Sequence, residues 1–280
     1  MPIQKGSIAI MCDVERMFHQ FHVIKEHQDY LRFLWWDKGD LNSKPSVYRM
    51  RVHLFGAASS PGCCNFGLKH LAAQGREKFS KETIQFIQRG FYVDDGLASV
   101  TSTAEAIQLV EESRALCKTG NLRLHKFVSN SKEVLAAIPE AEQAQAKDQD
   151  MALGETHIER ALGVQWCIEA DEFQSESDLP KLAALKIPRS YSKNIDIARY
   201  ELHNFSDASL NGYGACSYLR AISKEGQITC SLVMGKARVT PTKQTTIPRL
   251  ELSSAVTSVR NADVIKRELE IGESSRVLLD

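Results

Sequence analysis

Phe91-Tyr92-Val93-Asp94-Asp95-Gly96-Leu97 is the stretch that decides the first half of the fold. Aspartate-glycine suits a turn with positive φ, and aromatic and β-branched residues flank it, so the stretch predicts a tight β-hairpin. Two carboxylates at a hairpin tip repel each other, and the pKa of each rises if neither is paired. Mg²⁺ binds through one or two carboxylates plus substrate phosphates, so the tip is a candidate half-site for phosphoryl transfer. The alternative is an ordinary solvated Asp-Gly turn.

Composition sets the class of the chain. With 280 residues, 43% of them hydrophobic, the chain is long enough for about two domains. The 35 basic and 35 acidic side chains cancel, so no global field attracts nucleic acid. Local asymmetry exists, because Leu41 to Ser60 holds three cations (Lys44, Arg49 and Arg51) and no acid. Any nucleic-acid binding must therefore come from local patches.

The cysteines and the N-terminus indicate the compartment. The seven cysteines include no Cys-x-x-Cys pair, and the adjacent Cys63 and Cys64 cannot form an ordinary disulfide. The chain also has no charged-then-apolar leader and no apolar run long enough to span a membrane. We therefore expect a reduced, intracellular protein, in a cytoplasmic particle or the nucleus, that is neither secreted nor inserted into a membrane.

Strands and helices alternate in the first half. Ile8 to Cys12 reads as a buried strand with Asp13 at its end, where the carboxylate is either a rigidly placed metal ligand or a helix N-cap. Ser60-Pro61 predicts a helix start. Together these features predict an α+β layer with helices on one face of a mostly antiparallel sheet. The further expected elements are a hairpin of Tyr30–Trp35 and Val47–Val52, a helix from Ser60 to about Phe79, a capped helix from Ser102 to Gly120 and a strand from Leu122 to Val128.

A polar stretch from Ala141 to Gln149 suggests a boundary, and a second domain opens near Tyr200. The pattern there predicts three strands in hairpin order, a long helix after Pro248 and a last strand at the chain's end, which together make a mixed sheet. Glu251 is expected in the first turn of that helix. The apolar residues expected to share one side of it are Leu252, Ala255, Val256, Val259 and Ala262.

An ordered set of motifs resembles a known family. Asp13 with the residues to Phe21, Phe55-Gly56 to Ser60-Pro61, and Tyr92-Val93-Asp94-Asp95 are similar to three successive motifs of reverse transcriptases. Leu122 to Asn130 and Leu162-Gly163-x-x-Trp166 are similar to the two that follow. The sequences of these motifs most resemble the polymerase of BEL/Pao-type LTR retrotransposons. The stretches at Phe205 and Ile247 resemble the start of the RNase H domain in the Pol polyprotein of those elements.

The resemblance implies roles for single residues. Asp13 and Asp94 would bridge two Mg²⁺ (or Mn²⁺) ions, Asp95 would support the same site, and Phe18 would act as an aromatic steric gate that favours deoxynucleotides. For Phe18, an ordinary place in the core is the alternative. Phe55 and Gly56 would border the nucleotide, and Lys126 would donate a proton to pyrophosphate. In the second half, Asp207, Glu251 and Asp280 would be three acidic ligands of a nuclease two-metal site.

The resemblance also implies an organisation: a reverse transcriptase palm fragment over 1–139, a connecting region over 140–199 and the N-terminal part of an RNase H-like domain over 200–280. Only twelve residues precede Asp13, so we expect an internal Pol fragment without fingers. The implied partners are an RNA template, a DNA primer, dNTPs, an RNA–DNA hybrid and other segments of the polyprotein. A non-catalytic remnant or a co-opted nucleic-acid-binding protein is the alternative. A viral RNA-dependent RNA polymerase palm is disfavoured by Phe18 and the nuclease-like second half.

Overall fold

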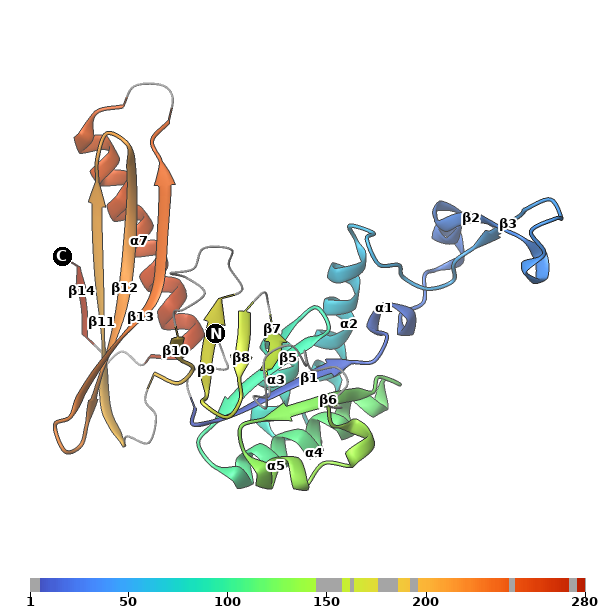
Figure 1. Cartoon of the computed structure of the whole chain (residues 1–280), viewed down its shortest axis with the longest axis horizontal. Helices are drawn as coiled ribbons and strands as arrows, with labels where there is room; N and C mark the ends of the chain where they lie inside the picture. The colour runs from blue at the N-terminus through green and yellow to red at the C-terminus, as the bar shows by residue number, and fades with distance from the viewer. Residues whose placement is uncertain are drawn as a thin grey trace. The chain divides into compact units, whose positions relative to one another are not determined.

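The structure, a computed structural model, describes residues 6–144, 158–161, 164–175, 186–191, 196–241, 245–271 and 276–279. The chain divides into two compact units, each of mixed α/β composition (Figure 1). The N-terminal unit comprises Ile8–Ala98 and Ser102–Ala161. The C-terminal unit comprises Leu162–Asp280 together with the short segments Met1–Ser7 and Ser99–Thr101. Each unit is described separately below.

A four-stranded sheet forms the centre of the N-terminal unit, with the strand order β4-β5-β1-β6. Strand β1 is central, and its residues Ala9 to Cys12 are all buried, as the apolar run predicts. It pairs antiparallel with β6, and β4 pairs antiparallel with β5. The bounds are β1 (Ile8–Val14), β4 (Phe91–Tyr92), β5 (Asp95–Val100) and β6 (Leu124–Ser129).

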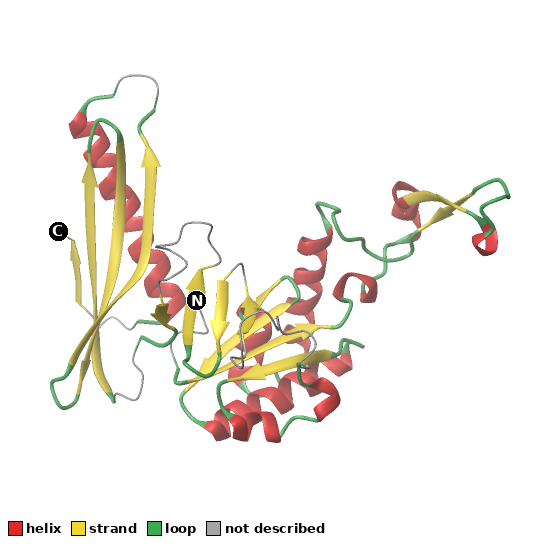
Figure 2. Cartoon of the chain, in the orientation of Figure 1, coloured by secondary structure: helices red, strands yellow, loops and turns green. Residues whose placement is uncertain are grey.

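Helices cover this sheet (Figure 2). Helix α4 contacts both β1 and β6, and its N-terminus is capped as predicted, because Ser102 Oγ accepts the N–H of Glu105 at 3.3 Å. The helix predicted to run from Ser60 to about Phe79 is shorter than expected: it ends at Gln74, since Gly75 closes it, and a separate helix follows. The bounds are α1 (Met17–Gln20), α2 (Ser60–Gln74), α3 (Lys81–Arg89), α4 (Thr103–Thr119), α5 (Lys132–Ala136) and the 3₁₀ turn η4 (Glu140–Glu142).

A two-stranded arm leaves the same unit between α1 and α2 (Figure 1). It confirms the predicted hairpin, with Phe33 opposite Tyr48 and Leu34 opposite Val47. The ladder continues inward through backbone hydrogen bonds such as Val23 N–H to Arg51 O at 2.9 Å. The arm consists of η2 (Lys25–Leu31), β2 (Arg32–Trp35), η3 (Asp37–Gly39) and β3 (Ser46–Arg49).

The C-terminal unit contains the predicted mixed sheet, in the order β13-β12-β11-β14. Strand β14 runs parallel to β11, whereas the other pairs are antiparallel. Helix α7 packs on one face, where Leu202 and Leu219 from the sheet meet Ala262, Ile265 and Leu269 from the helix. The bounds are β11 (Ile197–Ala208), β12 (Gly212–Ser223), β13 (Ile228–Val239), α7 (Ile247–Leu269) and β14 (Arg276–Leu279).

Of the five apolar residues predicted to share one side of α7, Ala262 is buried in the core and the other four are exposed. Leu252, Val256 and Val259 are 66%, 42% and 44% exposed. The inner face instead carries Ser254, whose hydroxyl donates to the carbonyl oxygens of Asp207 (2.9 Å) and Gly214. These bonds fix the rotation of the helix, so its inner and outer faces do not follow apolar periodicity alone. Among the described residues, no helix is both long and apolar enough to cross a membrane.

Short strands precede that sheet, and a buried ion pair anchors them. Arg189 has no exposed surface; its Nε donates to Asp171 Oδ1 at 2.5 Å and its Nη2 to Asp171 Oδ2 at 2.9 Å. The same guanidinium donates to the carbonyl oxygens of Gly6 (3.0 Å) and Ser7 (2.8 Å), and Trp166 Nε1 donates to Asp171 at 3.2 Å. The strands are β8 (Val164–Cys167), β9 (Glu172–Ser175) and β10 (Lys186–Pro188); β7 (Ile158–Ala161), the last strand of the N-terminal unit, precedes them in the chain.

Replacing Arg189 by methionine should destabilise the C-terminal unit by about 3–5 kcal/mol, because it leaves the Asp171 carboxylate buried without its cation. Urea unfolding followed by Trp166 fluorescence measures the change. The matched control is Lys224→Met, which removes the 2.8 Å pair with Asp196, where both side chains are largely exposed. That exposed pair should contribute less than about 1 kcal/mol. Equal losses of unfolding free energy in the two variants would contradict the expectation that burial makes the Arg189–Asp171 pair the more important one.

Glu112 should make the N-terminal unit acid-sensitive. Hydrogen bonds from Gln108 and from Ser80 lower the pKa of Glu112 from 4.5 to about 2. A lowered folded-state pKa stabilises the fold above the ordinary pKa, and this stabilisation is lost as pH falls from 4.5 toward 2. Glu112→Gln should therefore flatten the decline of the urea midpoint across that window. Glu111→Gln, the exposed neighbour on α4, is the control and should leave the slope unchanged.

Candidate functional site

Three of the predicted carboxylates lie on neighbouring strands of the N-terminal sheet. Asp13 is near the end of β1, while Asp94 lies in the β4–β5 turn and Asp95 begins β5. Strand β5 is adjacent to β1, and the N–H of Val14 donates to the carbonyl oxygen of Asp94 at 3.0 Å. All three aspartates are half-buried. The fold therefore brings together acidic residues that are far apart in sequence.

The turn itself differs from the expected Asp-Gly turn. The positive φ falls on Val93, at 57°, whereas Asp95 and Gly96 belong to strand β5 and pair with Tyr92 and Phe91. Gly96 serves close packing instead: a Cβ there would lie 2.7 Å from Cys12 Sγ and from the Phe91 ring. The glycine thus lets β5 approach β1, and a β-branched residue takes the strained position, which is uncommon.

Repulsion and burial act on these carboxylates together. The pKa of Asp95 is raised to about 6. Burial is the largest cause, followed by the negative charges of Asp94 and Asp13. Burial is also the main cause that raises the pKa of Asp13, with a further contribution from Asp94, while His125 and Lys126 oppose the shift. Asp13 and Asp95 therefore carry their charges at a cost, which nearby positive charge would reduce.

His125 is the residue that the sequence analysis missed. It lies opposite Asp13 in the β1–β6 register, and its Nε2 is 2.7 Å from Asp13 Oδ1. No local signal points to it, because the contact joins residues 112 positions apart and depends on the strand register. The interaction holds one oxygen of Asp13 and fixes the orientation of its carboxylate.

The other predicted contributors to this site have different surroundings. Phe18 is 5% exposed and packs edge-to-face on Phe55, with ring centroids 4.7 Å apart, as a core residue would. Phe55 is 62% exposed, and Gly56 has φ 82° with open space around it. Lys126 is exposed, at φ 52° on β6. The assignments of Phe18 as a gate and Lys126 as an acid stay predictions.

Across the described residues, no group of three or more His, Cys, Asp or Glu side chains is arranged to hold a metal ion. The donor chemistry nevertheless suits a hard cation, because Asp13, Asp94 and Asp95 offer carboxylate oxygens. A bound ion would have to share Asp13 with His125. The site is thus a set of repelling carboxylates rather than a finished coordination shell.

The second predicted site lies in the C-terminal unit. Asp207 is exposed on β11, and Glu251 is exposed on α7, away from the apolar core. Glu251 is the fifth residue of the helix, one residue beyond the expected first turn. The two elements are tied beside these residues by Ser254, which donates to the carbonyl oxygen of Asp207 at 2.9 Å. Asp280 lies outside the described residues.

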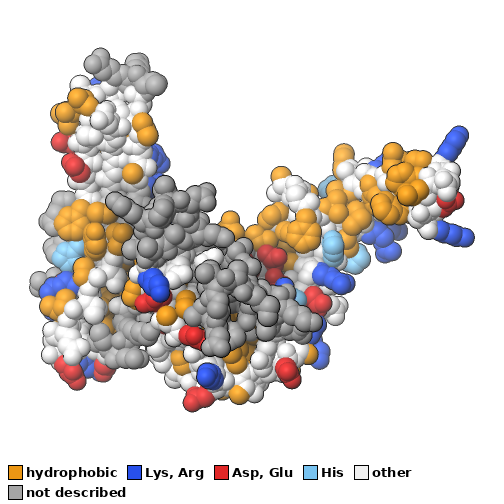
Figure 3. All heavy atoms as spheres, in the orientation of Figure 1, with side chains coloured by type: hydrophobic (Ala, Val, Ile, Leu, Met, Phe, Trp, Pro, Cys, Tyr) orange, Lys and Arg blue, Asp and Glu red, His pale blue; other side chains and the backbone are white. Residues whose placement is uncertain are grey.

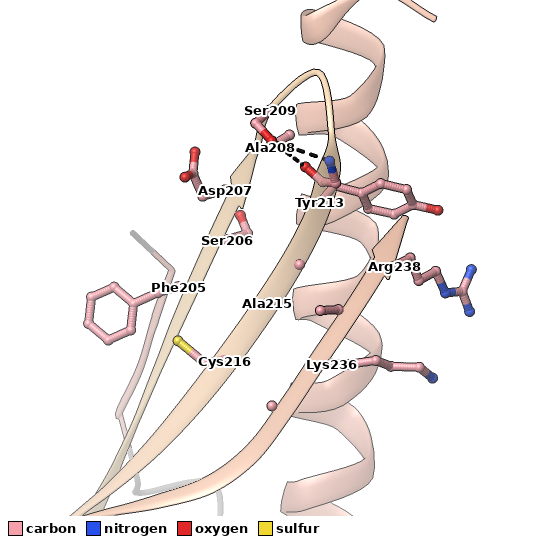
Figure 4. A pocket seen from close by; sticks show the side chains of 14 residues that line it. Phe205, Ser206, Asp207, Ala208, Ser209, Tyr213, Ala215, Cys216, Lys236 and Arg238 are labelled. Atoms are coloured by element: carbon pink, nitrogen blue, oxygen red, sulfur yellow. Dashed lines mark hydrogen bonds between the residues drawn. The ribbon is translucent and has the colours of Figure 1, made fainter. Parts of the chain in front are cut away.

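An open groove surrounds Asp207 at the β11–β12 end of this sheet (Figure 4). Tyr213, Lys236 and Arg238 line it, and in the figure they point to the opposite side from Asp207 and Phe205. Ser209 and Gly212 close the β11–β12 turn by hydrogen bonds. The groove is thus lined by one carboxylate on β11 and two cations on β13, with β12 between them.

Comparisons with known proteins agree with the expectation for this unit. Residues 155–279 match a protein-family profile described as the Pao retrotransposon-like RNaseH-like domain. The match includes β11 to β14 and α7, together with the short strands before them. It begins earlier than residue 200, where the sequence analysis placed the start of the nuclease-like part.

Two solved structures of the foamy viral protease-reverse transcriptase also align with the chain, both at TM-scores below 0.5. One, the dRH form in complex with double-stranded DNA, has a TM-score of 0.46 at 13% identity. The other, also in complex with double-stranded DNA, has a TM-score of 0.44 at 12% identity. Each comparison covers 99% of this chain, which spans only 51% and 60% of those chains.

No curated protein sequence matches the chain. The family profile is therefore the comparison that bears on function, and it covers the C-terminal part alone. The resemblance inferred from sequence is confirmed for that part: residues 155–279 are similar to the RNase H-like region of a retroelement polyprotein.

Proposed function

We propose that the N-terminal unit is the palm of a retrotransposon reverse transcriptase, with Asp13, Asp94 and Asp95 as the ligands of divalent cations for nucleotidyl transfer. The observation that carries the proposal is the electrostatic one: burial and mutual repulsion raise the pKa values of Asp13 and Asp95 on adjacent strands. A divalent cation bound between such carboxylates would stabilise their charged forms. The ordered sequence motifs supply the reaction class.

In this proposal each residue has a limited task. Asp13 and Asp94 hold the cations from two different strands, and Asp95 supports the same site from the start of β5. His125 orients the Asp13 carboxylate through its 2.7 Å contact. When bound, Mg²⁺ or Mn²⁺ would activate the primer 3′-hydroxyl and neutralise charge on the triphosphate of an incoming dNTP and on the leaving pyrophosphate. The template would be RNA and the primer DNA.

Cation binding tests the proposal without requiring catalysis. Titration of the chain with Mn²⁺, followed by electron paramagnetic resonance of the free ion, should reveal binding that Asp94→Asn weakens about tenfold or more, because a ligand and a negative charge are changed. Glu77→Gln, which removes one exposed negative charge from the same unit, should leave the affinity unchanged. Equal Mn²⁺ affinity in wild type and Asp94→Asn would favour a non-catalytic, nucleic-acid-binding role instead.

The match to the RNaseH-like profile supports a second proposed activity, cleavage of the RNA strand of an RNA–DNA hybrid by the C-terminal unit. Asp207 and Glu251 would hold the cations, since both side chains are exposed and their elements are joined by Ser254. The resemblance adds Asp280 as the third ligand.

Hybrid cleavage by the whole chain in Mn²⁺ should be lost in Asp207→Asn and retained in Asp94→Asn, because the two variants change different units. Denaturing electrophoresis of an end-labelled RNA strand measures the products. Asp196→Asn, an exposed aspartate of the same unit, controls for charge. Cleavage by Asp207→Asn at the wild-type rate would contradict the assignment of that residue.

A further inference from the structure

Strands β1 and β5 are tied to each other at both ends. At the end near the carboxylates, the N–H of Val14 donates to the carbonyl oxygen of Asp94 at 3.0 Å. At the other end, the N–H of Gly6, just before β1, donates to Ser99 Oγ in β5 at 2.8 Å. Bonds at both ends of a strand pair fix how far one strand can slide along the other. The two ends together therefore set the register of β1 against β5.

The end away from the carboxylates is packed tightly. A Cβ on Gly6 would lie 2.2 Å from the carbonyl oxygen of Val100, which is far inside van der Waals contact. Ser7 Oγ donates to the carbonyl oxygen of Thr101 at 3.2 Å in the same place. The segments Met1–Ser7 and Ser99–Thr101 group with the C-terminal unit, although β1 and most of β5 belong to the N-terminal one. This close contact depends on the absence of a side chain at residue 6.

Arg189 holds the same place within the C-terminal unit. Its Nη1 donates to the carbonyl oxygen of Gly6 at 3.0 Å and its Nη2 to that of Ser7 at 2.8 Å. Asp171 binds the same guanidinium through both carboxylate oxygens, which fixes its orientation. Lys and Arg side chains lie scattered over the surface, as Figure 3 shows for one face, whereas Arg189 is fully buried. We call the bonds from Arg189 to Gly6 and Ser7 the clamp.

The clamp is too far from the carboxylates to act on them by charge. Asp13 lies near the opposite end of β1, about 20 Å from Ser7 at a rise of about 3.3 Å per residue. That separation exceeds the screening length of about 8–10 Å at ordinary ionic strength. The clamp can reach the site only through the backbone of the strands. Repulsion between Asp13 and Asp95 favours movement of one strand past the other, and a fixed register opposes that movement.

We propose that Arg189 is a positioning residue for the carboxylate site: by holding the chain before β1 against the end of β5, it keeps the register that brings Asp13 and Asp95 together. The inference rests on the proposed function of that site. Side chains alternate along a strand, so a slip of one residue would turn Asp13 to the other face of the sheet. A cation would then lose its ligand from β1. Arg189 touches neither carboxylate, and its contribution is to their geometry.

Hydrogen exchange measures the clamp directly. Peptides from β1 and β5 are followed by mass spectrometry in the whole chain without added metal. Arg189→Lys keeps a positive charge for Asp171 but removes the forked donors. It should speed exchange in both strands about tenfold or more, because their local opening becomes easier. Arg199→Lys, which changes an exposed arginine paired with Glu201 in the same unit, is the matched control and should leave this exchange unchanged.

A second variant tests the clamp if Arg189→Lys folds poorly. Gly6→Ala retains both Arg189 and Asp171 but adds the Cβ that would collide with the carbonyl oxygen of Val100. It should also speed exchange in β1 and β5. Gly235→Ala on β13 is the matched control, because a Cβ there meets nothing within 4 Å.

Mn²⁺ titration then connects the clamp with the site. Arg189→Lys and Gly6→Ala should each weaken Mn²⁺ binding about threefold or more, although neither changes a proposed ligand. If the wild-type chain binds no Mn²⁺, the proposed function fails, and hydrogen exchange alone decides whether Arg189 holds the two strands. Exchange in β1 and β5 as slow as in wild type in the folded variants would overturn the proposal. Faster exchange with unchanged Mn²⁺ affinity would also overturn it, because the strands would then move without affecting the site.

Discussion

The central constraint is a carboxylate near the end of a fully buried strand. Residues Ala9 to Cys12 have no appreciable exposure, so β1 cannot move away from its neighbours without uncovering apolar surface. Asp13 is carried at a fixed place by this strand, and β5 brings Asp95 beside it through the close approach that Gly96 permits. The hydrophobic core therefore holds like charges together, although their electrostatics alone would separate them. A bound cation would relieve this repulsion.

The features that could be predicted from sequence are those with local causes. The Ser102 cap is set within four residues, and the strand order of the C-terminal sheet follows from short turns and a long amphipathic helix. The predicted mixed sheet is also confirmed, because β14 follows the helix and pairs parallel with β11. The arm likewise follows from alternation and loop composition.

What could not be predicted depends on contacts between distant residues. The partner of Asp13 is set by the register of β1 against β6, which nothing near His125 encodes. The positive φ lies on Val93 and not on the expected Asp-Gly pair, because the register of β4 and β5 makes Val93 and Asp94 the turn residues. Repulsion between the adjacent carboxylates of Asp94 and Asp95 could be predicted from sequence. Their burial, which raises the pKa of Asp95 to about 6, depends on the tertiary fold.

The buried face of helix α7 also could not be predicted from sequence, because it depends on packing against the sheet. Its inner face carries Ser254, Ser258 and Asn261, all buried, while Leu252 and Val256 remain exposed. Opposite it, Ser217 Oγ donates to Asn204 Oδ1 at 2.7 Å, so the sheet also presents polar groups inward. Ser254 donates to the sheet, whereas Ser258 Oγ and Asn261 Nδ2 have no hydrogen-bond partner among the described residues. The same face also buries Leu250, Ala262, Ile265 and Leu269, so Ser254 and this apolar contact together hold α7 beside β11, with Glu251 exposed.

The two carboxylate sites accordingly differ in physical character. In the N-terminal unit half-buried aspartates repel one another, and water screens their charges incompletely. In the C-terminal unit Asp207 and Glu251 are exposed, and water screens their charges when no cation is bound. A cation there must compete with hydration of both groups. The same ligand chemistry thus gives a strained site on buried strands and a relaxed one at a sheet edge, and the difference arises from burial rather than from residue type.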